Sequence, residues 1–391
     1  MANAFPKKPL FRQYIMNMYE HSNSSLNTYL DKPVLFYAKS RNFDFGPNNR
    51  QNVSNLSKFI SHRIILEYDI VLRALEKHKF QVIEKFIQEI FWRIYWKGWL
   101  ELRPQVWEDF IEYRHKGDTS SFDAAINGET GIECFDDWVN ELKETNYLHN
   151  HTRMWFASIW IFTLKLPWQL GARFFLEHLY DGDAGSNTLG WRWVAGLQTK
   201  GKHYIAKPWN IRKYTNERYF NFHLNEESQP LSEDYTYSIE PFPYERREEM
   251  LSDCLLLTDS DLNFNGRKEF YGKYKRIFLL TLSNRKRIIP VSRNVLKFKS
   301  NAISSFKKHF QHAEICDDSF DEVARTIINF DVPYPFVGEN LDYIKRLEKD
   351  LGLNINFLVR REDSFCIPLC KKGFFDFKKN IPEIIKIIKM Q

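Results

Sequence analysis

The spacing of apolar residues changes once along this 391-residue chain, and the change divides it into two parts. Through residues 54–115 apolar residues recur every three or four positions, which predicts amphipathic helices. The helical pattern continues through residues 133–180, where Pro167 should end or kink a helix. No stretch before residue 224 alternates like a strand, so we predict an all-α domain over residues 1–224.

Residues 225–250, NEESQPLSEDYTYSIEPFPYERREEM, are polar, unpatterned and interrupted by prolines, which is typical of a linker. After them, short apolar runs such as CLLLTD and RIFLLTL alternate with helical stretches such as NLDYIKRLEKDLG. Strands that alternate with helices favour a parallel sheet. We therefore predict a smaller, Rossmann-like α/β domain over residues 251–391, after the all-α domain. It contains no GxGxxG or Walker loop, so its fold class alone assigns it no ligand.

Composition narrows the class of protein. All 11 tryptophans lie between Trp92 and Trp209, so the two parts should have different cores. The net charge of +6 permits a nucleic-acid partner without requiring one. The five scattered cysteines favour a reducing compartment over a secreted disulfide framework. The first residues lack the apolar core of a signal peptide, and the most apolar run, 154–168, is too short to span a membrane. We expect a soluble, cytoplasmic monomer.

Metal binding is not expected. Cys366 and Cys370 could share one helix turn, but no nearby His or Cys completes a set of four ligands. Residues 1–224 contain only Cys134, which excludes a four-cysteine cluster in the helical part. His149 and His151 lie two positions apart and would point to different sides of a helix.

The helix QEIFWRIYW places Glu89, Trp92, Arg93 and Trp96 on one face. Two interpretations stay open. The more ordinary one is a partly buried Glu89–Arg93 pair between core indoles. The other is a pocket floor that offers a flat apolar surface, a carboxylate and a guanidinium to a flat polar ligand.

The stretch DGDAGSNTLGWRWVAG, residues 181–196, combines two carboxylates, an amide and two indoles. A buried carboxylate needs a partner, and Arg153 is our candidate for Asp181. Farther along, LQTKGKHYIAKPWNIRKYTNER (197–218) holds six basic residues against one acidic residue, with Tyr204 and Trp209 among them. Such a segment could follow a phosphate backbone, although a solvated basic loop explains it equally well.

Several of these motifs, in this order, resemble the photolyase–cryptochrome family. FLEHLYDGDAGSNTLGWRWVAG resembles its flavin-binding core, whose pattern is close to DGDxAxNxxxWxW. The resemblance extends through TGIECFDDWVNELKETNYLHNHTRM (130–154) and FIQEIFWRIYW (86–96), and more loosely through FYAKSRNF (36–43) and VSNLS (53–57). It implies that residues 36–220 hold a U-shaped FAD in a helical cavity.

The resemblance also implies roles for single residues. Asp181 would pair with Arg153 near the isoalloxazine, Asp183 would face the ring edge, and the amide of Asn187 would lie opposite N5. VSNLS departs from the usual TSRLS-like turn at Val53 and Asn55, so some phosphate contacts are missing. The complete implied set of cofactor-binding residues is Tyr37, Ser54, Leu56, Ser57, Arg93, Asn150, Arg153, Asp181, Asp183 and Asn187.

The implied activity is light-dependent repair of cyclobutane pyrimidine dimers, by electron transfer from photoexcited reduced FAD to a dimer flipped out of DNA. Glu89, Trp92, Asn150 and Met154 would line the mouth where the dimer enters. Relatives that repair (6-4) photoproducts usually carry two histidines where this chain has Asn150 and Met154, so the chain is most similar to bacterial cyclobutane-dimer photolyases. The expected DNA-contacting residues are Arg93, His151, Lys200, Lys202, Lys207 and Arg212.

The electron relay of the family is only partly present. Trp191 and Trp168 stand at its proximal and middle positions, and both count among the expected catalytic residues. The distal position falls near His115, where no tryptophan occurs. The relay would end in Tyr113, or use another indole such as Trp107 or Trp160.

The order of the two parts departs from the family, which normally carries an α/β antenna domain before the flavin domain. Here the α/β part follows, and its residues 332–383 faintly resemble the end of an antenna domain. A pterin or deazaflavin antenna chromophore is therefore a further expectation. Two alternative functions stay open: a cryptochrome-like blue-light photoreceptor whose C-terminal part reports the flavin state, and a flavoprotein of this fold without light chemistry.

Overall fold

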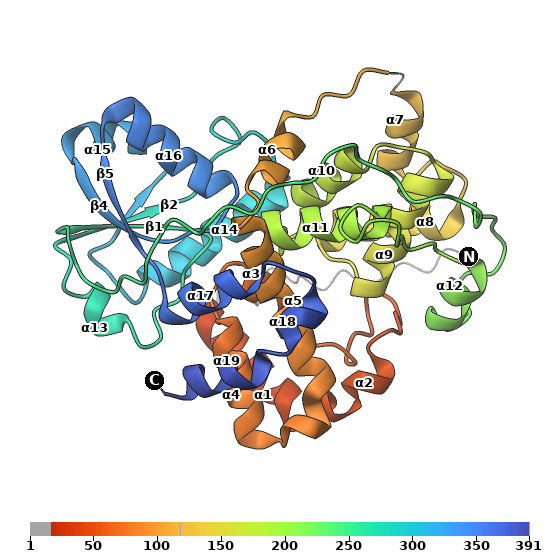
Figure 1. Cartoon of the computed structure of the whole chain (residues 1–391), viewed down its shortest axis with the longest axis horizontal. Helices are drawn as coiled ribbons and strands as arrows, with labels where there is room; N and C mark the ends of the chain where they lie inside the picture. The colour runs from red at the N-terminus through yellow and green to blue at the C-terminus, as the bar shows by residue number, and fades with distance from the viewer. Residues whose placement is uncertain (1–16, 118, 391) are drawn as a thin grey trace, which may run out of the picture.

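The computed structural model describes residues 17–117 and 119–390, so the start of the chain that argued against a signal peptide lies outside it. Helices make up the regular structure up to residue 214, and the described strands all follow residue 253 (Figure 1). The helical part comprises α1 (Met18–Asp31), η2 (Pro33–Phe36), α2 (Tyr37–Ser40), α3 (Ser57–Ser61), α4 (Glu67–Lys77), α5 (Phe80–Glu101), α6 (Gln105–Glu112), α7 (Ser120–Asn127), α8 (Glu133–Thr145), α9 (Asn150–Ser158), η3 (Ile159–Thr163), α10 (Trp168–His178), α11 (Ala184–Ala195) and α12 (Pro208–Tyr214).

The second part contains one parallel sheet. Its strands lie in the order β3-β2-β1-β4-β5, which is the order of a doubly wound sheet. In register, Leu255 pairs with Ile277 on one side and with Asp331 on the other. The strands and the helices between them are β1 (Cys254–Thr258), α13 (Lys268–Tyr271), β2 (Arg276–Leu280), α14 (Arg293–Lys307), β3 (Glu314–Cys316), α15 (Phe320–Thr326), β4 (Asn329–Pro333), α16 (Glu339–Leu351) and β5 (Asn354–Leu358). The prediction of a Rossmann-like parallel sheet is confirmed.

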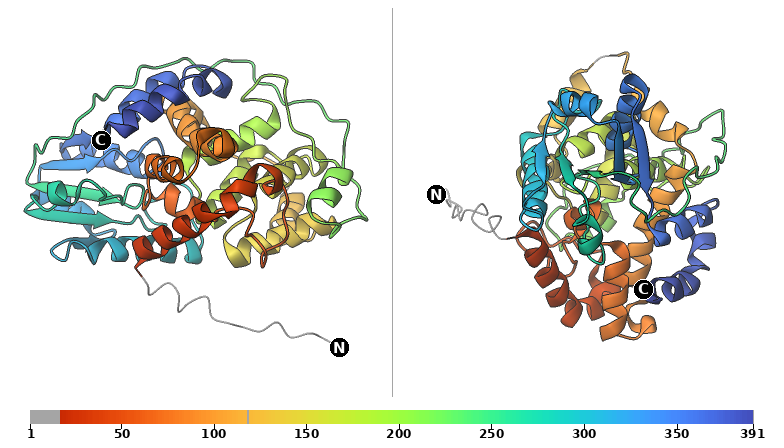
Figure 2. Two further views of the ribbon diagram at one scale, coloured as in Figure 1. Left: turned by 90° about the horizontal axis from the view of Figure 1, so that it is seen from below. Right: turned by 90° about the vertical axis from the view of Figure 1, so that its left-hand side faces the viewer.

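The chain then leaves the sheet and returns to the helical part. Helices α17 (Arg361–Cys366), η4 (Ile367–Leu369), α18 (Phe374–Lys378) and α19 (Ile381–Lys389) pack beside α4 and α5 (Figures 1 and 2). The close approach requires Gly98, because a Cβ there would lie 2.6 Å from Cys370 Sγ and 3.3 Å from Ile367 Cα. The last thirty residues therefore belong, by packing, to the helical wall around α5.

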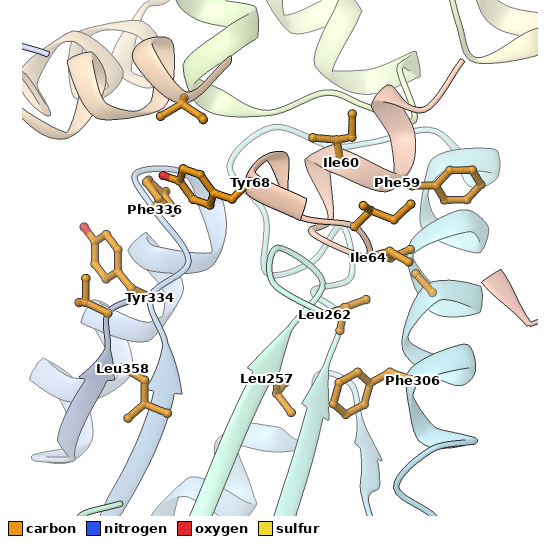
Figure 3. Close-up of a cluster of buried hydrophobic side chains, with 14 of the residues drawn as sticks. Phe59, Ile60, Ile64, Tyr68, Leu257, Leu262, Phe306, Tyr334, Phe336 and Leu358 are labelled. Atoms are coloured by element: carbon orange, nitrogen blue, oxygen red, sulfur yellow. The ribbon is translucent and has the colours of Figure 1, made fainter. Parts of the chain in front are cut away.

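The two parts share one hydrophobic core. Phe59, Ile64 and Tyr68 of the helical part pack in the same cluster as Leu257 and Phe306 of the sheet part (Figure 3). Burial of each such side chain contributes about 1.5–3 kcal/mol, so the cluster holds the two parts together. Because side chains from both sides of residues 225–250 pack in this one core, a division of the chain into two domains at this segment stays a prediction.

A second core contains most of the tryptophans. Its buried side chains include Trp107 of α6, Trp138 of α8, Trp155 of α9 and Trp160 of η3. Most tryptophans thus gather in a core built mainly by the helical part, but the expectation that the two parts have different cores is wrong, because both parts share the first core. The first core includes α1, α4 and α5 of the helical part.

The segment between residues 225 and 250 has no helix or strand, as predicted. It is held to the helical part along its length. The Glu233 carboxylate accepts hydrogen bonds of 2.6 and 2.7 Å from the Arg192 guanidinium, and the Glu240 amide donates to the Leu102 carbonyl at 2.9 Å. The linker therefore follows a defined path over the helices before it reaches β1 (Figure 1).

Candidate functional site

A cavity of about 490 Å³ lies between α5, α9, α11 and α18, which is within the usual range for a small-molecule site. Most of the residues expected to bind cofactor or lesion line it. They are Ser57, Glu89, Trp92, Arg93, Asn150, Arg153, Met154, Asp181, Asn187 and Trp191. The structure thus gathers residues from four separate stretches of sequence around one hollow.

The expected Arg153–Asp181 pair is present in this cavity. The Nη2 atom of Arg153 donates to both carboxylate oxygens of Asp181 at 3.0 Å, and its Nε donates to the Leu148 carbonyl at 2.9 Å. Burial raises the pKa of the Asp181 carboxyl, but Arg153 and Arg93 more than offset this and hold it below its usual value. Asp181 is therefore an ionised, fixed carboxylate on the cavity wall.

The expected Glu89–Arg93 pair is wrong. Glu89 accepts a hydrogen bond from Arg41 Nη1 at 2.9 Å, while Arg93 forms its ion pair with Asp183. Glu89 also lies 3.6 Å from Lys85 Nζ on its own helix, whereas Arg93 pairs with an acid from another segment. Asp183 also caps α11, since its carboxylate accepts from the Ser186 amide at 2.8 Å.

Three buried polar atoms on the cavity wall lack hydrogen-bond partners among the described residues. They are Ser57 Oγ, Ser186 Oγ and Trp191 Nε1. A buried polar group without a partner costs about 1–3 kcal/mol, so these atoms favour a polar ligand in the cavity. Ser57 and Ser186 offer hydroxyls to phosphate or sugar groups, and Trp191 offers a donor.

Gly190, which has no side chain, also indicates that a ligand occupies this cavity. It lies inside α11, lines the cavity, and a Cβ built on it would meet nothing within 4 Å. Glycine inside a helix costs about 1 kcal/mol relative to alanine, and packing of the chain gives no reason for it here. A large ligand lying against α11 would explain it, and FAD fits the hydroxyls, the arginine pairs and this open surface.

Asn187 lies on the same face of α11 and is buried. Its side-chain amide donates to the Ala172 carbonyl at 2.8 Å, which fixes its orientation. The side chain therefore lines the cavity in one defined position. Its contact with flavin N5 stays a prediction.

Four expected cofactor residues do not line the cavity: Leu56, Tyr37, Ser54 and Asp183, whose carboxylate is paired with Arg93. The Leu56 side chain is 1% exposed in the hydrophobic core, which leaves only its backbone for a phosphate contact. Tyr37 packs edge-on against Phe86, with ring centroids 5.5 Å apart. Ser54 lies in the turn before α3. Phosphate contacts from Tyr37 and Ser54 stay predictions.

His151 is not placed to touch DNA, contrary to expectation. Its ring is buried, stacks on Trp155 with centroids 4.1 Å apart, and lies 2.9 Å from the Asn42 carbonyl and 3.2 Å from the Tyr204 hydroxyl. Burial lowers its pKa, so the ring is neutral. Of the basic residues expected to contact DNA, four are exposed, namely Lys200, Lys202, Lys207 and Arg212. Arg93 is only 15% exposed and forms an ion pair with Asp183.

The aromatic contacts around Trp191 favour one relay alternative. The Trp191 indole meets the Trp160 ring edge-on, with centroids 6.0 Å apart, and a Cβ at Gly171 would collide with both rings. Trp160 lies in the π-helical turn η3, a feature often found at functional sites. Trp168, at the expected middle position, stacks on Phe110 at 5.6 Å.

Sequence reasoning missed two residues of the cavity wall, Phe374 and Phe375 of α18. The Phe374 ring lies parallel to the Trp92 indole, with centroids 3.7 Å apart and an angle of 12° between the planes. One face of the expected apolar surface is therefore already covered. The only sequence signal was local, an aromatic cluster between pairs of lysines in KKGFFDFKK.

A second cavity lies at the carboxyl ends of β1 and β4, where Ser260, Arg287, Gly338 and Asn340 meet Asp183. This is the edge at which doubly wound sheets bind ligands. Its volume of about 100 Å³ is well below the 300 Å³ at which small-molecule sites usually begin. An antenna chromophore stays a prediction, and one bound here would need the cavity to open.

None of the described helices is long and apolar enough to cross a lipid bilayer. Over residues 17–117 and 119–390, no three His, Cys, Asp or Glu side chains come together as a metal site. All five cysteines are free thiols.

Comparison with known proteins agrees with this cavity. Residues 86–249 match the FAD binding domain of DNA photolyase. The deoxyribodipyrimidine photo-lyase of Vibrio cholerae is 25% identical over 48% of this chain and 41% of its own length. That of Streptomyces griseus is 35% identical over 37% of this chain and 32% of its own. The chain therefore spans less than half the length of these curated relatives.

Solved structures give matches of similar extent. A class III photolyase from Agrobacterium tumefaciens is 25% identical, with a TM-score of 0.45 over 54% of this chain and 46% of its own. A Synechocystis cryptochrome is 20% identical, with a TM-score of 0.46 over 54% of this chain and 47% of its own. The family match covers α9, α11 and most of α5, but not α18, which completes the cavity wall. Residues 86–249 are therefore similar to the FAD-binding domain of DNA photolyase.

Proposed function

We propose that this protein is a light-dependent DNA repair enzyme that splits cyclobutane pyrimidine dimers. The observation that supports this most is the cavity of about 490 Å³, which has the Arg153–Asp181 pair and Glu89, Trp92 and Met154 on its walls. Reduced FAD, when bound there, supplies the light-driven electron that the reaction needs. Cofactor and extruded base would then lie together in one hollow.

The chain's own part in cofactor binding is electrostatic. Arg153 and Arg93, each paired with an aspartate, bring two guanidinium groups to the wall. Their hydrogen bonds hold the charges in place before any ligand arrives. Such fixed charges decide which charge state of a bound redox group is stable.

The lesion would meet a mixed surface. Glu89 is partly exposed and can accept hydrogen bonds from a pyrimidine edge, while Trp92 and Met154 provide apolar contacts. The Asn150 and Met154 side chains stand where relatives that repair (6-4) photoproducts usually have histidines. This favours cyclobutane dimers as substrate. DNA on both sides of the lesion would meet the exposed lysines between residues 200 and 207.

The direct test uses the flavin-loaded, reduced protein and an oligonucleotide with one thymine dimer under near-UV light. We expect dimer content to fall with illumination and to stay constant in the dark or with flavin-free protein. Unchanged dimer content in the light would contradict the proposal.

Because every cysteine is a free thiol, we also place the protein in a reducing compartment such as the cytoplasm.

A cryptochrome-like photoreceptor is the second candidate. It is favoured by α18, which belongs to the C-terminal part and contributes Phe374 to the cavity wall. A structural change at a cofactor in the cavity would therefore act directly on the C-terminal part. It predicts light-dependent protease sensitivity in residues 225–391 without dimer repair. A flavin spectrum with neither response would point to a flavoprotein without light chemistry.

A further inference from the structure

The segment KKGFFDFKK, residues 371–379, brings an exposed aromatic ring to the mouth of the cavity. Phe374 and Phe375 both line the cavity, but they differ in exposure. Phe374 is 4% exposed, beneath the Trp92 indole, whereas Phe375 is 78% exposed. Phe375 therefore contributes little to packing of the chain and remains available to a ligand.

The backbone that carries Phe375 is fixed to α5. The Tyr95 hydroxyl donates to the Lys372 carbonyl at 2.8 Å, and Arg103 Nη2 donates to the Lys371 carbonyl at 2.6 Å. Lys378 forms an ion pair of 3.2 Å with Glu84, and the buried Phe374 stacks on Trp92. With these contacts on both sides, α18 is a built part of the wall, and the Phe375 ring is presented at low entropic cost.

The charges around this ring identify its partner. Lys371, Lys372 and Lys379 are exposed, and one acidic residue, Asp376, lies among them. A single exposed phenylalanine needs no explanation by itself. An exposed aromatic ring on a fixed backbone, beside a cavity and flanked by cations, matches the way proteins hold a nucleotide, by stacking on the base and pairing with its phosphates.

We propose that Phe375 stacks on an unpaired nucleobase of DNA at the cavity mouth, while Lys371 and Lys372 contact the adjacent phosphates. The C-terminal segment thereby becomes part of the DNA-binding surface, although it lies far in sequence from the helices that form the rest of the cavity. This inference rests on the proposed repair function, because it requires a strand opened at a lesion. An undamaged, fully paired duplex has no base free to reach the ring.

The first experiment compares three full-length, flavin-loaded variants with the wild type. Affinity for a duplex with one thymine dimer is measured by fluorescence anisotropy. Loss of a stacked base costs about 1–3 kcal/mol, so Phe375→Ala should weaken binding by about tenfold. Phe375→Trp should bind like the wild type. Ile328→Ala, which removes another exposed apolar side chain (64% exposed) before β4, should also have no effect.

A double lysine variant tests the proposed phosphate contacts and leaves the aromatic residues unchanged. Lys371→Gln with Lys372→Gln leaves the hydrogen bonds of both backbone carbonyls in place. Each lost phosphate contact should lower the slope of log affinity against log salt by about 0.7–0.9. Flavin content, read from absorbance near 450 nm, should be the same in all variants.

The outcomes separate the two proposals. A wild-type protein that neither binds nor repairs dimer DNA would overturn both. Repair by the wild type, with unchanged affinity in Phe375→Ala and an unchanged salt slope in the lysine variant, would overturn only the role of the C-terminal segment. Weaker binding in Phe375→Ala with unchanged flavin content, restored in Phe375→Trp, supports the inference.

Discussion

Arg63 and Asp363 form a doubly hydrogen-bonded ion pair, with Nη1–Oδ2 and Nη2–Oδ1 distances of 2.6 and 2.8 Å. Both side chains are almost completely buried. Arg63 follows α3 in the helical part, and Asp363 lies in α17, so the pair joins the C-terminal helices to the cavity-bearing part. Arg63 also adopts a positive φ of 47°, a backbone conformation that non-glycine residues hold only when their surroundings fix it.

Breaking this pair should destabilise the whole protein. Asp363→Ala leaves a buried guanidinium without its main partner, which costs about 3–5 kcal/mol of the free energy of unfolding. Urea denaturation measures the loss. The control is Glu314→Ala at the exposed Arg276–Glu314 pair, which should cost less than about 1 kcal/mol. Equal losses in the two variants would contradict a structural role for the buried pair.

Gly190 should report the presence of the cofactor. Gly190→Leu places a side chain in open cavity space and replaces a poor helix former, so the flavin-free protein should gain about 1 kcal/mol of stability. The same side chain should lower the FAD content of the purified protein, measured from absorbance near 450 nm. Gly190→Ala adds one methyl group and should keep most of the stability gain with a smaller loss of FAD. Full FAD content in Gly190→Leu would place the cofactor elsewhere.

The sequence predicted those parts of the site that follow from local rules or general chemical needs. Apolar residues spaced three or four apart predicted the helical part, and short apolar runs after residue 250 predicted the strands of the sheet. The Arg153–Asp181 pair followed because a buried carboxylate requires a cation, and the family resemblance pointed to Arg153 as that cation. These inferences need no knowledge of how distant segments pack.

Long-range contacts could not be predicted in this way. Spacing on α5 favoured a Glu89–Arg93 pair, but Arg41 and Asp183 compete for these charges from other segments. The stacking of Phe374 on Trp92 depends on the return of the chain after β5, which no local pattern in the sequence encodes. The C-terminal helices were therefore assigned with the sheet, although they pack on α5.

Trp160 should carry electrons to the cavity if the repair function holds. Its ring contacts the Trp191 indole, whereas Trp107 contacts Phe110 and donates its Nε1 hydrogen to Asp342 at 2.8 Å. Trp160→Phe should therefore slow the photoreduction of bound FAD by an external thiol, followed by the loss of absorbance near 450 nm. Trp107→Phe, a change of the same size in the same core, should leave the rate unchanged. Equal rates in the two variants would exclude the Trp160 route.

His149 should make the stability of the protein depend on pH between about 4 and 6.5. The His149 ring caps α9, with Nδ1 accepting from the His151 amide at 3.2 Å. Burial lowers its pKa to about 4, although the Asp44 carboxylate acts in the opposite direction. In the unfolded chain a histidine titrates near 6.5, so between these values unfolding takes up a proton.

The sign of the effect follows from this proton uptake. The His149 contribution to the free energy of unfolding is complete above about pH 6.5 and is lost as pH falls toward about 4, with a slope of up to about 1.4 kcal/mol per pH unit. His149→Asn keeps a helix-capping side chain and should remove this slope, while other histidines keep theirs. His149→Ala should remove the same slope and also cost about 1 kcal/mol at every pH, because the cap is lost. Urea unfolding at several pH values measures both terms, and a His149→Asn curve parallel to the wild-type curve would contradict a neutral, buried His149.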